Sequence, residues 1–303
     1  MKISASTAFS SFSLGKRSLV FGCLLFWGIS QAQSVRIVAA GDIACDPEMV
    51  NTTIEGLCDS DVTADLIVSL EPDAVLALGD IQYEHAELDH FERVYDRTWG
   101  RFKNLTYPTP GNHEYYTDSS DYFAYFGAAA GENQQGYYSL SLGNWQLISL
   151  NSNCSFVACG ADSAQAQWLR ETLNSSPQTC TLAFWHHPRY SSGEHGDTAT
   201  LSELWEILDA HGVELLLSGH DHHYERFAAQ DAFGQVKTNG VRQFVVGTGG
   251  RSLYGVESVA ANSEAVVDDS FGVLELSLNP ETYSWRFVTP DGMFDEGRAE
   301  CQK

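Results

Sequence analysis

Five short motifs constrain this chain more than any other feature, because each contains residues of the kinds that bind metal ions. In chain order they are Gly41-Asp42, Gly79-Asp80-Ile81-Gln82-Tyr83, Gly111-Asn112-His113-Glu114, His186-His187-Pro188 and Gly219-His220-Asp221-His222. Four of them follow an apolar run directly, and the remaining one follows a short loop. This pattern predicts that oxygen and imidazole ligands lie at the ends of several strands and meet in one crevice.

The mixture of ligand types indicates a site for two metals. Carboxylate and amide oxygens suit hard cations, whereas imidazole suits Fe, Zn or Mn. Two metals that share a carboxylate can stabilise the attacking and the leaving oxygen of an in-line displacement. They also lower the pKa of a water that bridges them. Taken singly, an aspartate after a strand is usually a turn residue, and a lone histidine is usually structural. The metal site is predicted from the joint occurrence of Asp42, Asp80, Asn112, His186, His220 and His222.

Apolar runs and amphipathic segments alternate along much of the chain. A strand over Val35–Ala40, a helix capped by Asp61 with Val62, Leu66 and Leu70 on one face, and a strand over 74–78 form a βαβ unit. Further strands are expected at 137–142, 145–150, 180–185, 213–217, 243–246, 271–278 and 282–288, and helices at 87–99, 162–173 and 201–208. The order predicts an α/β fold with two packed β-sheets flanked by helices.

Residues 1–32 have the pattern of a secretory signal peptide. Three basic residues and no acidic one accompany an apolar core over Leu19–Ile29, and Ser30-Gln31-Ala32 has the small residues of a cleavage site. A transit peptide and lipid attachment at Cys23 are the competing interpretations, and the compact apolar core that continues past Cys23 disfavours both. We therefore predict a secreted or periplasmic protein with one catalytic domain over 33–303 and no stable membrane insertion after removal of the signal.

The charge of the mature chain disfavours a polyanionic partner. The chain has 17 basic and 40 acidic residues, and the first 32 positions hold three of the basic ones, which leaves a net charge of 14 − 40 = −26. Such a surface repels nucleic acid, although the charge alone is equally consistent with a role in solubility.

Six cysteines follow the signal segment, an even number that favours disulfides in an exported chain. Local spacing suggests the pairs Cys45–Cys58, Cys154–Cys159 and Cys180–Cys301, which are one of fifteen possible arrangements. A cysteine zinc site is disfavoured because no CxxC pair occurs.

The five motifs together resemble those of the calcineurin-like metallophosphoesterases, and specifically the purple acid phosphatase branch. The first motif is Asp42-Ile43-Ala44 where most of that superfamily has Asp-x-His, and Tyr83 stands three residues after Asp80, where the purple enzymes have an iron-binding phenolate. Glu114 and Tyr224-Glu225-Arg226 are similar to the plant-type enzymes. The resemblance extends from Asp42 to about residue 246 and implies the four-layer α/β/β/α fold.

The resemblance also implies a set of metal ligands and two metal ions, Fe(III) with Zn, Mn or Fe(II). One metal would be bound by Asp42, Tyr83 and His222, and the other by Asn112, His186 and His220, with Asp80 bridging them. His113 would not be a ligand but would face the substrate, where it stabilises phosphoryl oxygens or protonates the leaving group. His195 resembles a second substrate-side histidine, and a surface loop histidine is the alternative.

Several neighbouring residues receive plainer interpretations from the sequence. His187 and His223 are expected to point away from the metals or to support the ligands. Arg251 is interpreted as a solvated charge, with binding of a substrate phosphate as the alternative, and Asp221 is interpreted as a turn residue.

The resemblance implies an acid phosphatase-like phosphoric ester hydrolase. The expected reaction is hydrolysis of small phosphomonoesters by in-line attack of a metal-bound hydroxide. Two alternatives stay open at this point: a phosphodiesterase with the same metal site, acting on cyclic nucleotides or lipid head groups, and a metal-stabilised binding protein without catalysis. The oligomeric state is not predicted.

Overall fold

The computed structural model describes residues 1–2, 4–5, 7–8, 10, 34–46 and 58–302. Contacts divide the chain into Met1–Gln31 and Ala32–Lys303, and the second unit contains every helix and strand of the described residues. Most of the predicted signal peptide, including its apolar core and cleavage site, lies outside the described residues, so the signal and the domain boundary at residue 33 stay predictions. Within the described ranges, no helix has both the length and the apolarity needed to cross a bilayer.

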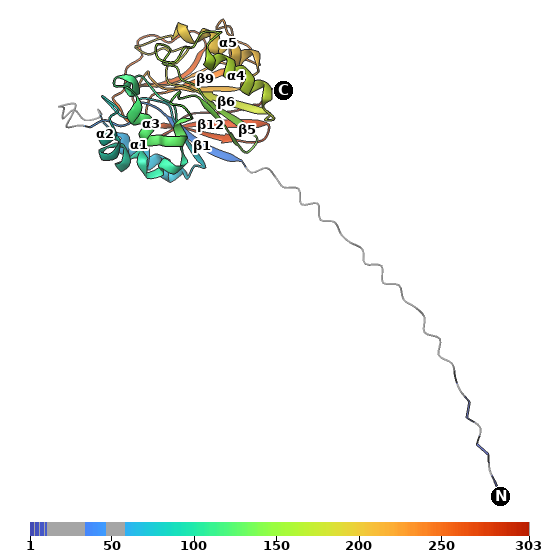
Figure 1. Cartoon of the computed structure of the whole chain (residues 1–303). Helices are drawn as coiled ribbons and strands as arrows, with labels where there is room; N and C mark the ends of the chain where they lie inside the picture. Colours follow the sequence, from blue (N-terminus) through green and yellow to red (C-terminus); the bar gives the residue numbers. More distant parts are fainter. Residues whose placement is uncertain (3, 6, 9, 11–33, 47–57, 303) are drawn as a thin grey trace. The chain divides into compact units, whose positions relative to one another are not determined.

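Two mixed β-sheets form the centre of the fold, as predicted (Figure 1). The first sheet has the order β13 (Gly292–Glu300), β12 (Thr282–Thr289), β11 (Val273–Leu278), β1 (Val35–Ala40), β2 (Ala74–Ala77), β3 (Thr106–Pro108). The second has the order β10 (Ser263–Val267), β8 (Tyr224–Phe227), β9 (Arg242–Val246), β7 (Leu215–Ser218), β6 (Cys180–Phe184), β5 (Trp145–Ser149), β4 (Tyr138–Leu142). Strands β1, β2 and β3 run parallel to one another, as do β5, β6, β7 and β9.

The helices flank the paired sheets. They are α1 (Ser60–Leu70), α2 (Leu88–Arg93), α3 (Ser120–Phe126), α4 (Ala164–Ser175) and α5 (Ser202–Ala210). The 3-10 segments are η1 (Tyr95–Arg97), η2 (Trp99–Leu105), η3 (His113–Tyr115), η4 (Gly127–Ala130) and η5 (Ala199–Leu201). The helix expected over 87–99 breaks into α2, η1 and η2. Thr98 leaves helical geometry, and its hydroxyl donates to the Tyr95 carbonyl at 3.2 Å, a side-chain bond that competes with helix continuation.

The most buried face of α1 is offset from the predicted one, although Leu66 and Leu70 of the predicted face also pack against the core. Asp59, not Asp61, precedes the first turn, and the fully buried apolar positions are Ala64 and Ile67. Thr63 lies on the same buried face, where its hydroxyl donates to the Gly249 carbonyl at 2.5 Å. Apolar spacing alone does not reveal this face, because one of its buried residues is a hydrogen-bonded threonine.

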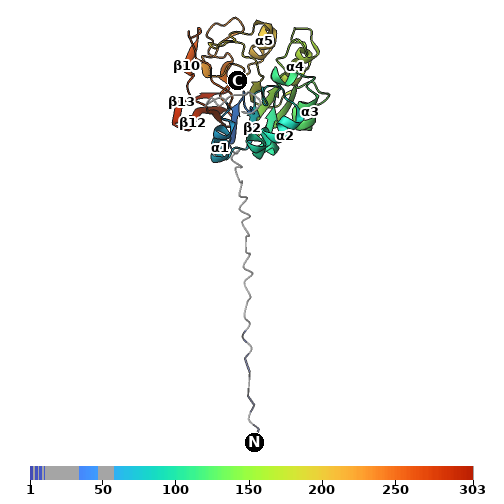
Figure 2. The ribbon, with the colours of Figure 1, turned by 90° about the vertical axis from the view of Figure 1, so that its left-hand side faces the viewer.

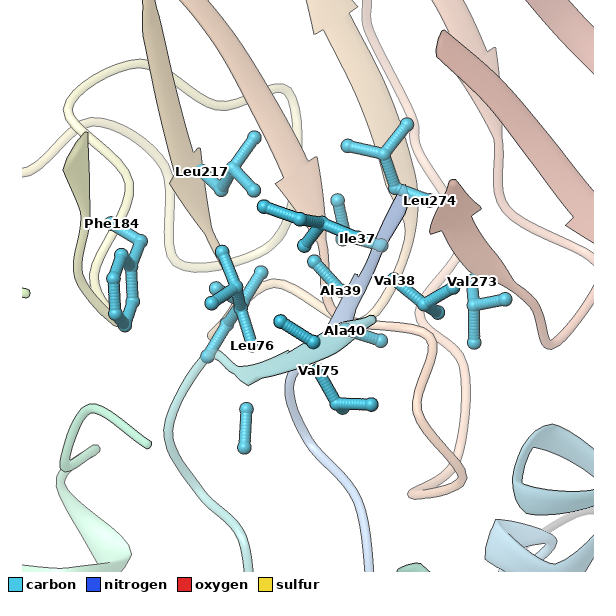
Figure 3. Packing of buried hydrophobic residues seen from close by; sticks show 14 of the residues in the cluster. Ile37, Val38, Ala39, Ala40, Val75, Leu76, Phe184, Leu217, Val273 and Leu274 are labelled. Carbon is cyan, nitrogen blue, oxygen red and sulfur yellow. The ribbon is translucent and has the colours of Figure 1, made fainter. Parts of the chain in front are cut away.

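Alternating side chains on the strands build two separate cores. In the second sheet Leu182, Phe184 and Leu217 face the first sheet, whereas Ala183 and Leu216 face α4 and α5. Figure 3 shows Phe184 and Leu217 near residues of β1 and β2 within the central core. The parallel strands are therefore covered on both faces, as expected for buried parallel strands.

All three predicted disulfides are present. They join Cys45 to Cys58, Cys154 to Cys159 and Cys180 to Cys301, with Cα–Cα separations of 5.4, 5.2 and 5.6 Å. The last one connects β6 to the end of β13. Figure 2 shows β10, β12 and β13 on the same side of the fold.

Glu214 gives a prediction for stability against pH. Glu214 is 2% exposed, and its carboxylate accepts hydrogen bonds from the backbone N–H groups of Thr181 and Gln302 at 2.6 and 2.9 Å. Burial raises the pKa of Glu214 from its usual 4.5 to about 7, although these backbone donors lower it. Because the folded pKa is the higher one, this group contributes stability below about pH 4.5 that is lost as the pH rises through 7.

Glu214→Gln should remove this pH dependence because the amide does not ionise. Between pH 4.5 and 7.5 the unfolding free energy of the wild type should fall relative to that of Glu214→Gln by up to about 3 kcal/mol. Urea denaturation across this range measures the difference, with the exposed Glu257→Gln as control. Parallel pH profiles for the wild type and Glu214→Gln would contradict the prediction.

Candidate metal centre

The predicted ligands lie at the carboxyl edges of both sheets. Asp42 and Asp80 follow the parallel strands β1 and β2, and Asn112 follows β3 after a short extended segment. His186 and His220 follow the parallel strands β6 and β7. Since the carboxyl ends of parallel strands meet at one edge, each sheet brings its own motifs together.

Hydrogen bonds join the two sets of loops directly. The Asp42 N–H donates to the Gly79 carbonyl at 3.0 Å, which keeps the loops after β1 and β2 side by side. Across the sheets, the His220 N–H donates to Asp42 Oδ2 at 2.8 Å, and His186 Nδ1 donates to the Leu78 carbonyl at 2.8 Å. The two sheets thus meet at the predicted site.

Backbone geometry at the site is unusual for residues with side chains. Asp42, Asp80 and His220 have φ angles of 61°, 47° and 72°, in the left-handed region that non-glycine residues rarely adopt. Gly111 permits the close approach at Asp80, because a Cβ atom on it would lie 2.1 Å from Asp80 Oδ1. Such strain is held by the surrounding structure and is typical of functional sites.

The first group of donors surrounds the hydroxyl of Tyr83. This oxygen lies 2.8 Å from Asp42 Oδ1, 3.1 Å from Asp80 Oδ2 and 3.1 Å from His222 Nε2. His222 Nε2 in turn lies 3.3 Å from Asp42 Oδ1. All four side chains are at most 3% exposed.

The second group surrounds Nε2 of His186. This nitrogen lies 3.2 Å from each of Asn112 Oδ1, His220 Nδ1 and Asp80 Oδ2. Asp80 Oδ2 therefore belongs to both groups. The structure brings all seven predicted ligands into one cluster that is centred on Asp80.

The chemistry of these donors fits metal ions. His186 and His222 donate from Nδ1 to the carbonyls of Leu78 and Ser252, so in the neutral state each turns an Nε2 lone pair toward carboxylate oxygens. Lone pairs that face one another at 3.2–3.3 Å repel, so this arrangement is satisfied either by a proton on the imidazole or by a metal ion between the two atoms. Ligands bonded at about 2.1 Å and at right angles lie about 3 Å apart, which matches these separations.

The ionisation of the site reflects the same concentration of negative charge. Burial lowers the pKa of His186, but Asp80 and Asp42 outweigh it and raise the value to about 9. Burial, Asp42 and Asp80 raise the pKa of Tyr83 well above its usual range. The cluster thus favours any cation, and a metal ion would reverse the effect on Tyr83.

Both predicted substrate-side histidines lie beside the cluster. The backbone N–H of His113 donates to Asp80 Oδ1 at 2.9 Å, and the ring Nδ1 of His113 donates to the Glu84 carbonyl at 2.7 Å. The ring of His195 stacks on that of His220, with centroids 4.3 Å apart. His195 is therefore not an isolated surface residue, although its side chain is exposed.

Comparison with known proteins identifies the family. The model of the calcineurin-like phosphoesterases matches residues 35–224, which is more than half of the chain. The chain belongs to the calcineurin-like phosphoesterase family. The predicted family and fold are thus confirmed.

Relatives of this calcineurin-like phosphoesterase include purple acid phosphatases. It is 28% identical over 229 residues to purple acid phosphatase 15 of Arabidopsis thaliana, an alignment that covers 63% of this chain and 40% of the relative. It is 24% identical over 242 residues to tartrate-resistant acid phosphatase type 5 of Mus musculus, covering 70% of this chain and 74% of the relative. The chain thus spans less than half of the plant relative.

A solved structure shows the same fold. The purple acid phosphatase PPD1 from seeds of yellow lupin (Lupinus luteus) superposes with a TM-score of 0.73 at 19% identity. The match covers 89% of this chain and 54% of that one.

The candidate site contains further residues whose roles the sequence did not show. Glu114 is fully buried, and its carboxylate accepts from the N–H groups of Asp80, Ile81 and Gly111 at 2.9, 2.9 and 2.7 Å. It thereby joins the second motif to the third. Its position directly after Asn112-His113 was the only signal in the sequence.

Arg251 is the second such residue, and its interpretation as a solvated charge is wrong. Its guanidinium bonds Glu84 Oε1 at 2.9 Å and lies 5.4 Å from the centre of the Tyr83 ring. The cation therefore stands beside the phenol that is predicted to bind iron. Nothing local distinguishes Arg251 in the sequence, because Glu84 lies 167 residues away.

His187 follows the second of its two expected roles, because it lies beside the predicted ligands and does not point away from them. One of its nitrogens lies within 4.8 Å of ligand nitrogens of both His186 and His220. Its Nδ1 is 2.8 Å from the hydroxyl of Ser152. Burial and His186 lower the pKa of His187 to about 3, so the ring is neutral near pH 7.

Proposed function

We propose that this protein is a binuclear metal-dependent phosphatase that hydrolyses small phosphomonoesters. The observation that carries the proposal is the position of Asp80 Oδ2, 3.1 Å from the Tyr83 hydroxyl and 3.2 Å from His186 Nε2. One carboxylate is thus shared by two complete groups of donors, which is the arrangement that a two-metal site requires. The names of the acid phosphatase relatives support a monoester substrate.

The residues divide between the two metals as the donor groups do. Asp42, Tyr83 and His222 would hold one ion, Asn112, His186 and His220 the other, and Asp80 would bridge them. A phenolate with carboxylate and imidazole suits Fe(III), and the imidazole-rich group suits Zn, Mn or Fe(II). When bound, the two metals supply a nucleophilic water near neutral pH and electrophilic stabilisation of phosphoryl oxygens.

His113 and His195 would act on the substrate. Nδ1 of His113 is engaged by the Glu84 carbonyl, so Nε2 is the atom left for a phosphoryl or leaving-group oxygen. His195 approaches the site from the loop after β6, stacked on His220. Two imidazoles on the substrate side can stabilise the developing negative charge and protonate the leaving group.

Export is part of the proposal. Three disulfides support an oxidising location, as expected for a secreted or periplasmic protein. The acidic net charge supports a small phosphoester as substrate and disfavours nucleic acid.

Metal analysis combined with turnover tests the function. Purified mature protein should contain two metals per chain by mass spectrometry and should hydrolyse p-nitrophenyl phosphate faster than bis(p-nitrophenyl) phosphate. Preference for the bis ester would replace the monoesterase with a phosphodiesterase on the same site. A protein loaded with two metals and inert to both esters would instead support a metal-stabilised binding protein.

Tyr83→Phe tests the phenolate ligand separately. The iron-loaded wild type should absorb visible light through a tyrosinate–iron transition, and Tyr83→Phe should lose this band because no phenolate remains. The visible spectra of both proteins at equal iron content provide the measurement, and the buried Tyr122→Phe serves as a control that keeps the band. A colourless iron-loaded wild type would exclude Tyr83 as an iron ligand.

A further inference from the structure

Asp221, which the sequence presents as a turn residue, is fully buried beside the metal centre. Both of its carboxylate oxygens accept hydrogen bonds from the loop that carries His195. Oδ1 of Asp221 accepts from the backbone N–H of His195 at 2.9 Å, and Oδ2 accepts from the Ser191 hydroxyl. A buried carboxylate that directs both oxygens at one loop holds that loop firmly, because leaving either oxygen unpaired is costly.

A second buried carboxylate from the same segment holds the same loop. Glu225 accepts from the N–H and the hydroxyl of Ser192 at 2.8 and 2.5 Å. Nε2 of His223 lies 3.1 Å from the same carboxylate and fixes its orientation. Residues 220–225 therefore supply two predicted metal ligands and also both anchors of the His195 loop.

The loop passes so close to Asp221 that only glycine fits at the point of contact. A Cβ atom on Gly193 would lie 2.4 Å from Asp221 Cγ. The result of this packing is the stacking of His195 on His220, with an interplanar angle of 28°. The position of His195 thus depends on contacts made by its backbone and its neighbours.

We infer that Asp221 is a positioning residue that sets His195 against the metal site, so that His195 contacts the substrate phosphoryl group or leaving group. The inference rests on the proposed phosphatase function. Asp221 is not among the predicted metal ligands, and it acts by fixing the backbone N–H of His195 to the turn that carries His220. Its effect on turnover should therefore pass entirely through His195.

A double-mutant cycle on the full metal-loaded enzyme tests the inference. His195→Ala, Asp221→Ala and Gly193→Ala should each lower kcat/KM for p-nitrophenyl phosphate by about 10²-fold, the usual contribution of a positioned acid–base group. Gly193→Ala reaches the loop without altering the segment that carries the ligands. In the His195→Ala background, Asp221→Ala and Gly193→Ala should cause no further loss. Asp221→Asn should recover much of the activity, because Oδ1 still accepts from the His195 N–H.

Two further readouts separate this role from a structural one. Metal content should stay unchanged in every variant, and the affinity for inorganic phosphate, measured by calorimetry, should show the same non-additivity as kcat/KM. Gly255→Ala is the matched control, since nothing lies within 4 Å of its added Cβ atom.

The contrary outcomes are distinct. Losses that multiply in the His195→Ala background, or loss of metal in Asp221→Asn, would overturn the inference. A metal-loaded wild type without turnover would contradict the proposed function. The double-mutant cycle measured by affinity for inorganic phosphate would still test the role of Asp221.

Discussion

Asp80→Asn is expected to abolish most phosphatase turnover, with a fall in kcat of roughly 10³-fold or more. The substitution removes the charge that two donor groups share, because Asp80 Oδ2 contacts both the Tyr83 hydroxyl and His186 Nε2. An amide can also place its NH₂ group toward these donors, where it cannot bind a cation. The protein should lose metal together with activity, which mass spectrometry and steady-state kinetics measure in parallel.

The fold should survive this change, because Asp80 contributes little apolar packing. Thermal unfolding of the metal-free proteins provides the comparison, and the exposed Asp291→Asn is the matched control that keeps both metal and turnover. Near-normal activity in Asp80→Asn would show that the shared carboxylate is wrongly assigned.

Glu114→Ala is expected to cause the largest loss of stability at the site. Its carboxylate accepts from four buried backbone N–H groups on two different loops, and burial together with Asp80 raises its pKa to about 7. Alanine would leave these donors without partners, and each unsatisfied buried group costs about 1–3 kcal/mol. We expect a loss of roughly 3–5 kcal/mol in the free energy of unfolding, with weaker metal binding as a consequence.

Urea denaturation and metal titration of Glu114→Ala provide the two measurements. Glu114→Gln is an informative companion, because its single oxygen can serve only some of the donors and should give an intermediate loss. The exposed Glu132→Ala is the control for removing a glutamate. Wild-type stability in Glu114→Ala would mean that the second and third motifs hold their positions without this carboxylate.

Local signals were sufficient for much of the fold and for the set of candidate ligands. The predicted ligands other than Tyr83 follow strands or glycine turns, so apolar runs and chain order located Asp42, Asp80 and His186 at the carboxyl ends of β1, β2 and β6. The family resemblance added Tyr83 and the pairing of ligands. The disulfides were also predicted correctly, including Cys180–Cys301, whose cysteines are separated by 121 positions.

Weak or misleading local signals explain the errors in the fold. Strand β13 is largely exposed and carries charged residues with two glycines, so it has little apolar alternation and is defined by its pairing with β12. The expected helix over 87–99 was interrupted by Thr98, whose side chain bonds the backbone. Propensity and periodicity do not reveal such pairing or side-chain competition.

The sequence by itself determined which chemical groups are present and at which strand ends they stand, because apolar periodicity and turn residues act over a few neighbouring positions. Only the tertiary structure decided that Asp80 lies between two donor groups, that Glu114 joins two loops and that Asp221 holds the loop of His195. Arg251 beside Tyr83 is a further case, since its partner Glu84 is 167 positions away. These roles depend on where two sheets meet, and no local pattern encodes the direction of a buried side chain toward a distant segment.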